Sequence, residues 1–146
     1  MILLIRGFPV AQGRPRFARI GEGVRAYDPA KSRTWKQDVA VQAIAQKPRM
    51  MEGPLDMELI FYLPRPKSLP KKVRHHVKKP DIDNLNKSVL DGLKGIAYKD
   101  DSQIVCKKTD KVYAEPGCSV GVWININPAG EPVLINWLDA PAAPEG

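Results

Sequence analysis

The chain has 146 residues and a mass of 16.2 kDa, a size typical of a single domain. Its net charge of +7 favours a polyanionic partner, and a hydrophobic content of 43% excludes a wholly disordered chain. The apolar run at residues 1–5 is far too short to span a bilayer, so nucleic acid is a better candidate partner than a membrane surface. No signal peptide is indicated and only two cysteines occur, so we expect a cytoplasmic protein.

The N-terminal region combines an apolar strand with a cationic arm. Residues 2–5 form an aliphatic run that predicts a short buried strand. Segments 14–20 and 24–27 flank Gly21-Glu22-Gly23, a turn signal that predicts a hairpin. This arm carries four arginines, which are Arg14, Arg16, Arg19 and Arg25. It also carries two aromatic residues, Phe17 and Tyr27. Packing within the hairpin and stacking on unpaired bases are both open for these aromatic side chains.

A helix and a long strand are expected next. Asp28-Pro29 is typical of a helix start, and apolar residues recur at helical spacing until Pro48, so we expect a helix over 29–46. Apolar and more polar residues alternate over 55–63, which is the clearest strand pattern in the sequence.

A basic loop at residues 64–80 follows that strand. It contains four prolines and no acidic residue, so it cannot form a regular element and concentrates positive charge. Its cations are Arg65, Lys67, Lys71, Lys72, Arg74, Lys78 and Lys79. A solvated loop is the simplest interpretation, but the carboxylates that follow it make DNA contact the better one.

The C-terminal half predicts a helix, two strands and a tail. Ile82, Leu85, Val89 and Leu93 form one stripe of a helix that ends near residues 92–95. Two strands, 104–113 and 118–126, are expected to pair as an antiparallel hairpin. Residues 127–146 form an acidic tail rich in Pro and Ala, so the expected domain is 1–126. Together these elements predict an α+β fold with a small mixed sheet and two main helices.

Acidic residues gather where the basic loop meets this second helix. Asp81 and Asp83 are two residues apart, and Asp83 and Lys87 are one helical turn apart on the same face. Asp100-Asp101 lies in the loop before the next strand, from which a short connection could fold it back to the helix start. At a separation of 4 Å two such charges repel by about 4 kcal/mol at an effective dielectric of 20, so a cluster of three persists mainly around a cation.

This donor set is suited to one kind of chemistry. Few hard oxygen ligands favour Mg²⁺ or Mn²⁺, and such an ion can activate water and stabilise the leaving oxygen in phosphodiester hydrolysis. Lys87 is placed to offset charge that develops in the transition state. Each acidic pair alone is better explained by helix capping or a turn. Their combination with a lysine and a basic loop favours a nuclease.

Two segments have a distinctive pattern, Lys79-Pro80-Asp81-Ile82-Asp83-Asn84-Leu85-Asn86-Lys87 and Tyr98-Lys99-Asp100-Asp101-Ser102-Gln103-Ile104. Because of these segments, the chain closely resembles the RusA family of Holliday junction resolvases, which are small, homodimeric, Mg²⁺-dependent endonucleases often encoded by prophages. Gly13-Arg14-Pro15-Arg16 and Tyr27-Asp28-Pro29 also resemble the family pattern, so the likeness covers residues 2–126.

The resemblance implies roles for individual residues. Asp81, Asp83 and Asp101 would be the catalytic carboxylates that hold Mg²⁺, for which Mn²⁺ can substitute, and Lys87 the essential basic residue beside them. Asn84 and Asp100 match the pattern as supporting residues. The residues expected to contact DNA are Arg14, Arg16, Lys67, Lys71, Lys72, Arg74, Lys78 and Lys79.

The expected function is resolution of four-way DNA junctions by paired symmetric nicks in recombination and repair. Two nicks related by a two-fold axis need two active sites, which favours a homodimer of a chain this small. Two alternatives remain open. One is a less selective nuclease that acts on flaps, forks or RNA, and the other is a DNA-binding accessory protein in which the carboxylates only cap the helix.

Overall fold

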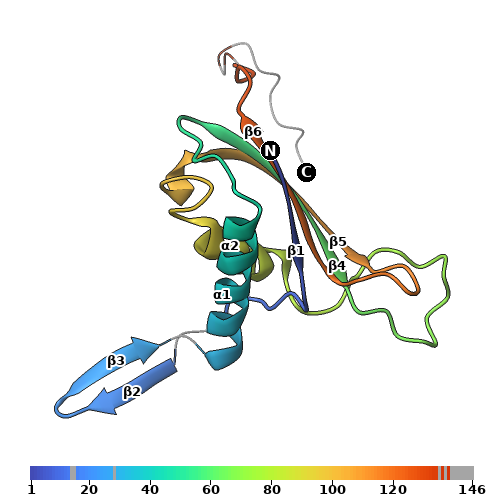
Figure 1. Cartoon of the computed structure of the whole chain (residues 1–146), viewed down its shortest axis with the longest axis horizontal. Coiled ribbons are helices and arrows are strands. Elements are labelled where there is room, and N and C mark those ends of the chain that lie inside the picture. Colours follow the sequence, from blue (N-terminus) through green and yellow to red (C-terminus); the bar gives the residue numbers. More distant parts are fainter. Residues whose placement is uncertain (14–15, 28, 135, 137, 139–146) are drawn as a thin grey trace.

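The computed structural model describes residues 1–13, 16–27, 29–134, 136 and 138. The strands are β1 (Ile2–Arg6), β2 (Arg16–Ile20), β3 (Gly23–Tyr27), β4 (Leu55–Leu63), β5 (Ile104–Tyr113) and β6 (Gly121–Pro128). The helices are α1 (Ala30–Ala45), α2 (Ile82–Leu93) and a 3-10 turn, η1 (Asp101–Gln103). The chain therefore has an α+β fold with two main helices, as the sequence predicted (Figure 1).

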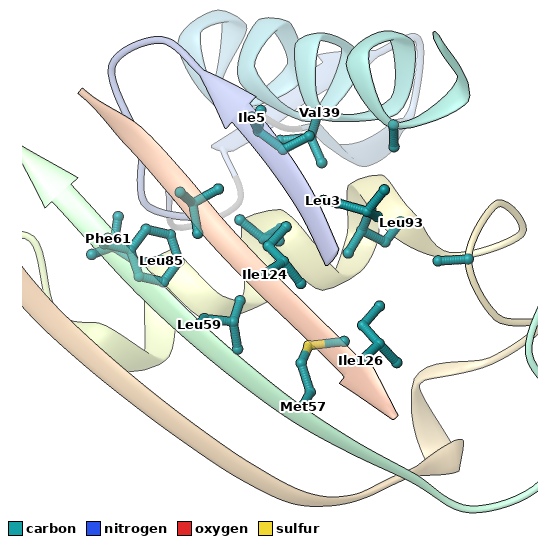
Figure 2. Packing of buried hydrophobic residues seen from close by; sticks show 14 of the residues in the cluster. Leu3, Ile5, Val39, Met57, Leu59, Phe61, Leu85, Leu93, Ile124 and Ile126 are labelled. Carbon is teal, nitrogen blue, oxygen red and sulfur yellow. The ribbon is translucent and has the colours of Figure 1, made fainter. Parts of the chain in front are cut away.

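Four strands form a mixed sheet in the order β1-β6-β4-β5. β4 and β5 run parallel and are connected through α2, while the other pairs are antiparallel. Both helices cover the same face of this sheet (Figures 1 and 2). β2 and β3 form a separate two-stranded hairpin that projects away from the sheet.

The predicted antiparallel hairpin of 104–113 with 118–126 is wrong. β5 and β6 both pair with β4, which lies between them, and β6 begins only at Gly121. The central position suits β4 because every second residue from Leu55 to Phe61 faces the helices, and all four of these residues are fully buried. β5 instead carries Lys107, Lys108 and Lys111, and charged strands are favoured at a sheet edge.

The core lies between the sheet and the two helices (Figure 2). Every second residue of β1, β4 and β6 points into it, as the alternating pattern predicts. Its fully or almost fully buried side chains include Leu3, Ile5, Val39, Met57, Leu59, Phe61, Leu85, Leu93, Ile124 and Ile126. This packing fixes α2, and with it the carboxylates at its start, against β4 and β5.

Gln42 of α1 and Gln46, which directly follows this helix, complete the free edge of β1. The side-chain amide of Gln46 accepts from the Leu4 backbone N–H at 3.0 Å and donates to the Leu4 carbonyl at 2.7 Å. Gln42 makes the same pair of hydrogen bonds with Arg6, at 2.8 and 2.7 Å. These side chains occupy backbone groups that an exposed edge strand would offer to another chain.

Gly92 lies where α1 and α2 pack closely against each other. A Cβ atom at this position would lie 2.8 Å from Cγ1 of Val39 and 3.0 Å from the carbonyl oxygen of Lys36. We expect Gly92→Ala to lower the free energy of unfolding by about 1–3 kcal/mol, because overpacking outweighs the better helix propensity of alanine. Urea unfolding measures this difference. Gly130→Ala, where a Cβ meets no atom within 4 Å, is the control, and equal midpoints for the two variants would contradict the prediction.

The remaining described segments are simpler. No helix in the described ranges is long and apolar enough to cross a membrane. Within the predicted tail, residues 135, 137 and 139–146 lie outside the described residues. Val133, Leu134 and Leu138 are almost fully exposed on the chain.

Candidate active site

Asp81 occupies the N-cap position of α2 but does not cap the helix with its side chain. Its backbone is extended, and its carboxylate instead accepts a hydrogen bond from Lys79 Nζ at 2.9 Å. This hydrogen bond, together with the charge of the ammonium group, lowers the pKa of the exposed Asp81 carboxyl. The capping interpretation therefore does not account for Asp81, which is held ionised at the surface.

Asp83, Asn84 and Lys87 extend from the first two turns of α2. All three are exposed, and Asp83 and Lys87 are one turn apart, as the helical spacing predicts. Neither the Asp83 carboxylate nor the Lys87 ammonium forms an ion pair within the described part of the chain. The first two turns of α2 thus present to solvent a carboxylate and a cation that form no ion pair within the described residues and lie one helical turn apart.

Polar contacts from β5 hold this end of α2 in place. Asn86 is buried on α2, and its Oδ1 accepts from Thr109 Oγ1 at 3.0 Å. Lys111 Nζ donates to the carbonyl oxygens of Lys78 and Pro80, the latter at 2.8 Å. Sequence reasoning missed these three residues. Thr109 and Lys111 are two residues apart, so both lie on the helix-facing side of β5. This spacing is the sequence signal by which these two residues could have been predicted.

Asp100 is engaged in a local capping box. Its carboxylate accepts from the hydroxyl and backbone N–H of Ser102, while the Gln103 side chain accepts from the Asp100 N–H at 3.0 Å. Lys94 Nζ lies 2.9 Å from the other Asp100 oxygen. The Ser102 hydroxyl and the Lys94 ammonium lower the pKa of Asp100 to about 2. Asp100 therefore shapes the turn that presents Asp101.

Asp101 is placed beside Tyr98, at the second half of α2. Tyr98 is buried and donates from its hydroxyl to the Leu90 carbonyl at 2.9 Å. Burial, and then the negative charge of Asp101, raise the pKa of Tyr98 above its ordinary value. Oδ1 of Asp101 is buried and makes no well-formed hydrogen bond with a described residue, although the Asp101 side chain interacts with the Tyr98 hydroxyl. A buried carboxylate oxygen with so little donor contact is costly, and a nearby cation would lower that cost.

Asp81 and Asp83 share the start of α2, but the structure does not bring Asp101 together with them. Within the described ranges, no three His, Cys, Asp or Glu side chains are grouped closely enough to hold a metal ion. The Leu90 carbonyl beside Tyr98 is seven residues beyond Asp83, or about 10 Å along the helix axis. Within the described residues of one chain, the three carboxylates are therefore not grouped as a metal site.

The basic loop is organised by Arg65. Its guanidinium donates to three backbone carbonyls, those of Ala114 and Pro70 at 3.0 Å and of Val73 at 2.7 Å. The same group lies over the Tyr113 ring, 5.5 Å from its centroid. Arg65 is therefore a structural residue, although its charge contributes to the surface.

The remaining predicted DNA contacts of this loop are exposed. They are Lys67, Lys71, Lys72, Arg74, Lys78 and Lys79. In the arm, Arg14 lies outside the described residues, and only the backbone of Arg16 is described. The loop ends at the residue before Asp81, so its cations flank the start of α2.

Arg65→Lys is expected to loosen the basic loop. A lysine has one ammonium group and cannot donate to three carbonyls that lie in different directions. We therefore expect the substitution to lower the free energy that stabilises the loop by about 1.5–3 kcal/mol. Hydrogen exchange should quicken at the Leu69 and Val73 amides, which are bonded within the loop. Lys67→Gln, a change at an exposed position, is the control. Unchanged exchange in Arg65→Lys would show that the loop is held by other contacts.

Comparison with known proteins decides the family. Residues 7–125 match the family model described as Endodeoxyribonuclease RusA, which covers most of the chain. The chain belongs to the RusA family. It is also 41% identical over 122 residues to the uncharacterized protein YqaN of Bacillus subtilis (strain 168), covering 76% of this chain and 86% of that protein.

The RusA match spans the arm, the basic loop, α2 and η1. Both aspartate motifs and Lys87 therefore fall inside it, whereas residues 126–146 fall outside. RusA membership implies an endodeoxyribonuclease of the kind that resolves Holliday junctions. The resemblance to the RusA family and the predicted α+β fold class are thus confirmed, and the chain is assigned to a class of DNA-cleaving enzymes.

Proposed function

We propose that this protein is a cytoplasmic, Mg²⁺-dependent resolvase that cuts four-way DNA junctions by paired symmetric nicks in recombination and repair. The observation that carries the proposal is the arrangement at the start of α2. Asp83 and Lys87 are exposed there and form no ion pair with a described residue, and the cations of the basic loop precede them, in a chain of the RusA family.

The chemistry of the donors fits a small divalent cation. All three proposed ligands, Asp81, Asp83 and Asp101, are carboxylates, and hard oxygen donors are those that Mg²⁺ and Mn²⁺ prefer. The Oδ1 atom of Asp101 is buried without a well-formed hydrogen bond, and the Asp83 carboxylate has no cationic partner among the described residues. The three carboxylates are not grouped around one point in a single chain, so Asp81 and Asp83 would hold the ion and Asp101 would have to approach it, by a rearrangement or from the second chain of the proposed dimer. An ion held in this way would supply an activated water and stabilise the leaving oxygen.

The chain's own residues would perform the remaining tasks. Cations of the basic loop would bind the DNA backbone and lead it to the first turn of α2. Lys87, one turn beyond Asp83, would stabilise negative charge on the phosphate as the bond breaks. Asn84 and Asp100 would position the two acidic segments, Asn84 through its place in the first turn and Asp100 through its capping box.

A homodimer follows from the symmetry of the substrate. Two nicks related by a two-fold axis need two sites, and an isologous pair of chains provides them in the required relation. Sedimentation of the free protein and of its junction complex measures this directly. A single chain bound to each junction would contradict the dimer.

The deciding experiment is cleavage of a synthetic four-way junction, with linear duplex and a fork as controls, in Mg²⁺ and in EDTA. Paired nicks at symmetric positions in the junction alone, abolished by EDTA, are expected. Equal cleavage of forks or flaps would favour a less selective nuclease. Binding without a cut in Mg²⁺ or Mn²⁺ would favour a DNA-binding accessory protein.

A further inference from the structure

The β2–β3 arm exposes apolar side chains that its own hairpin does not bury. The arm lies apart from the sheet and from both helices (Figure 1). Phe17 is 72% exposed, Val24 69% and Ile20 60%. Two interpretations were open for Phe17, packing within the hairpin and stacking on unpaired bases. The exposure of its side chain argues against packing within the hairpin. A two-stranded hairpin is marginally stable alone in water, so an exposed aromatic residue on it indicates a partner.

The base of the arm is fixed beside the candidate active site. Gln12 N–H donates to the Asn84 carbonyl at 2.9 Å, and Asn84 directly follows Asp83 on α2. The two ends of the arm also touch, because a Cβ atom on Gly13 would lie 2.8 Å from Cγ of Pro29. The arm therefore leaves the body of the protein next to the proposed catalytic carboxylates.

The chemistry of the arm fits nucleic acid. Phe17 and Arg19 are two residues apart on one strand, and Arg19 pairs with Val24 across the hairpin, so these three side chains share a face. The arm sequence contains four arginines against the single acid Glu22. Aromatic side chains that stack on unpaired bases, next to cations that contact phosphates, are typical of proteins that bind unstacked nucleic acid.

We propose that Phe17 stacks on an exposed base at the branch point of the DNA and thereby selects branched DNA over linear duplex. The inference rests on the proposed function and adds a specificity-determining residue to it. Phe17 is five residues beyond Gln12, which gives a reach of about 16 Å in extended chain. At a rise of about 3.4 Å per base pair, the contacted base lies within about five base pairs of the cut phosphate.

Junction binding by Phe17→Ala tests the inference, with Val41→Ala as the matched control because Val41 is an exposed apolar residue on α1. The junction carries 2-aminopurine at the branch point, and binding is measured without Mg²⁺. Loss of one stacked base is expected to weaken junction binding by about 5- to 150-fold, with duplex binding unchanged. The fluorescence change of 2-aminopurine should disappear in Phe17→Ala and return in Phe17→Trp.

Several results would overturn the inference. Equal losses of junction and duplex affinity would make Phe17 a general binding residue, and an unchanged 2-aminopurine signal in Phe17→Ala would exclude stacking. A shift from dimer to monomer in sedimentation of Phe17→Ala would assign the arm to a second copy of the chain. The proposed function is tested separately. If the wild-type protein bound junctions through Phe17 but never cut them, the role of Phe17 would stand and the proposed nuclease activity would be wrong.

Discussion

Asp83→Asn is expected to abolish junction cleavage while leaving junction binding intact. The substitution removes the charge of a proposed metal ligand but keeps its size, and the side chain is exposed, so the fold should not change. Metal stabilisation of the transition state is worth several kcal/mol, and each 1.36 kcal/mol is tenfold in rate, so a loss of at least about a thousandfold is expected. Single-turnover cleavage and a binding titration on the same junction measure the two effects.

Asp56→Asn is the control for this experiment. Asp56 is an exposed carboxylate on β4, on the sheet face opposite the helices, where its neutralisation should leave the cleavage rate unchanged. Cleavage by Asp83→Asn at the wild-type rate would remove Asp83 from the site. If junction affinity fell as much as the cleavage rate in Asp83→Asn, Asp83 would instead be a residue that shapes the DNA-binding surface.

Junction affinity is expected to fall by about 10³- to 10⁵-fold between 50 and 200 mM salt. That range corresponds to 6–10 phosphate contacts, each of which releases condensed counterions when a cation binds. Exposed lysines of the basic loop would supply part of this number. The double substitution of Lys71 and Lys72 by Gln should therefore reduce the slope of log affinity against log salt by about two.

The matched control is Lys47→Gln, which removes an exposed charge just beyond the end of α1, outside the basic loop. Its salt slope should equal that of the wild type. A flat salt response of the wild type would mean that phosphate contacts do not dominate binding. An unchanged slope in the Lys71 and Lys72 variant would move the DNA path away from the loop.

Local patterns predicted most elements because each pattern has one favourable way to bury its apolar side. Alternation over 55–63 matches β4, and the helix expected over 29–46 is α1. Partner choice in the sheet could not be predicted in this way. Strands 104–113 and 121–128 are neighbours in sequence, but each gains more by pairing with the apolar β4 than with the other.

The family, the fold class and a set of candidate acidic and basic residues could be predicted from the amino-acid sequence, because motifs and periodicity are local properties. The positions of these residues in space follow from tertiary packing. In the tertiary structure, the Asp81 side chain does not cap α2, and Asp101 lies beside Tyr98. The Arg65 guanidinium donates to three backbone carbonyls, and Gln12 at the base of the arm donates to the Asn84 carbonyl. Such contacts join segments far apart in the chain, and they depend on which strand takes the centre of the sheet and how closely α1 and α2 pack.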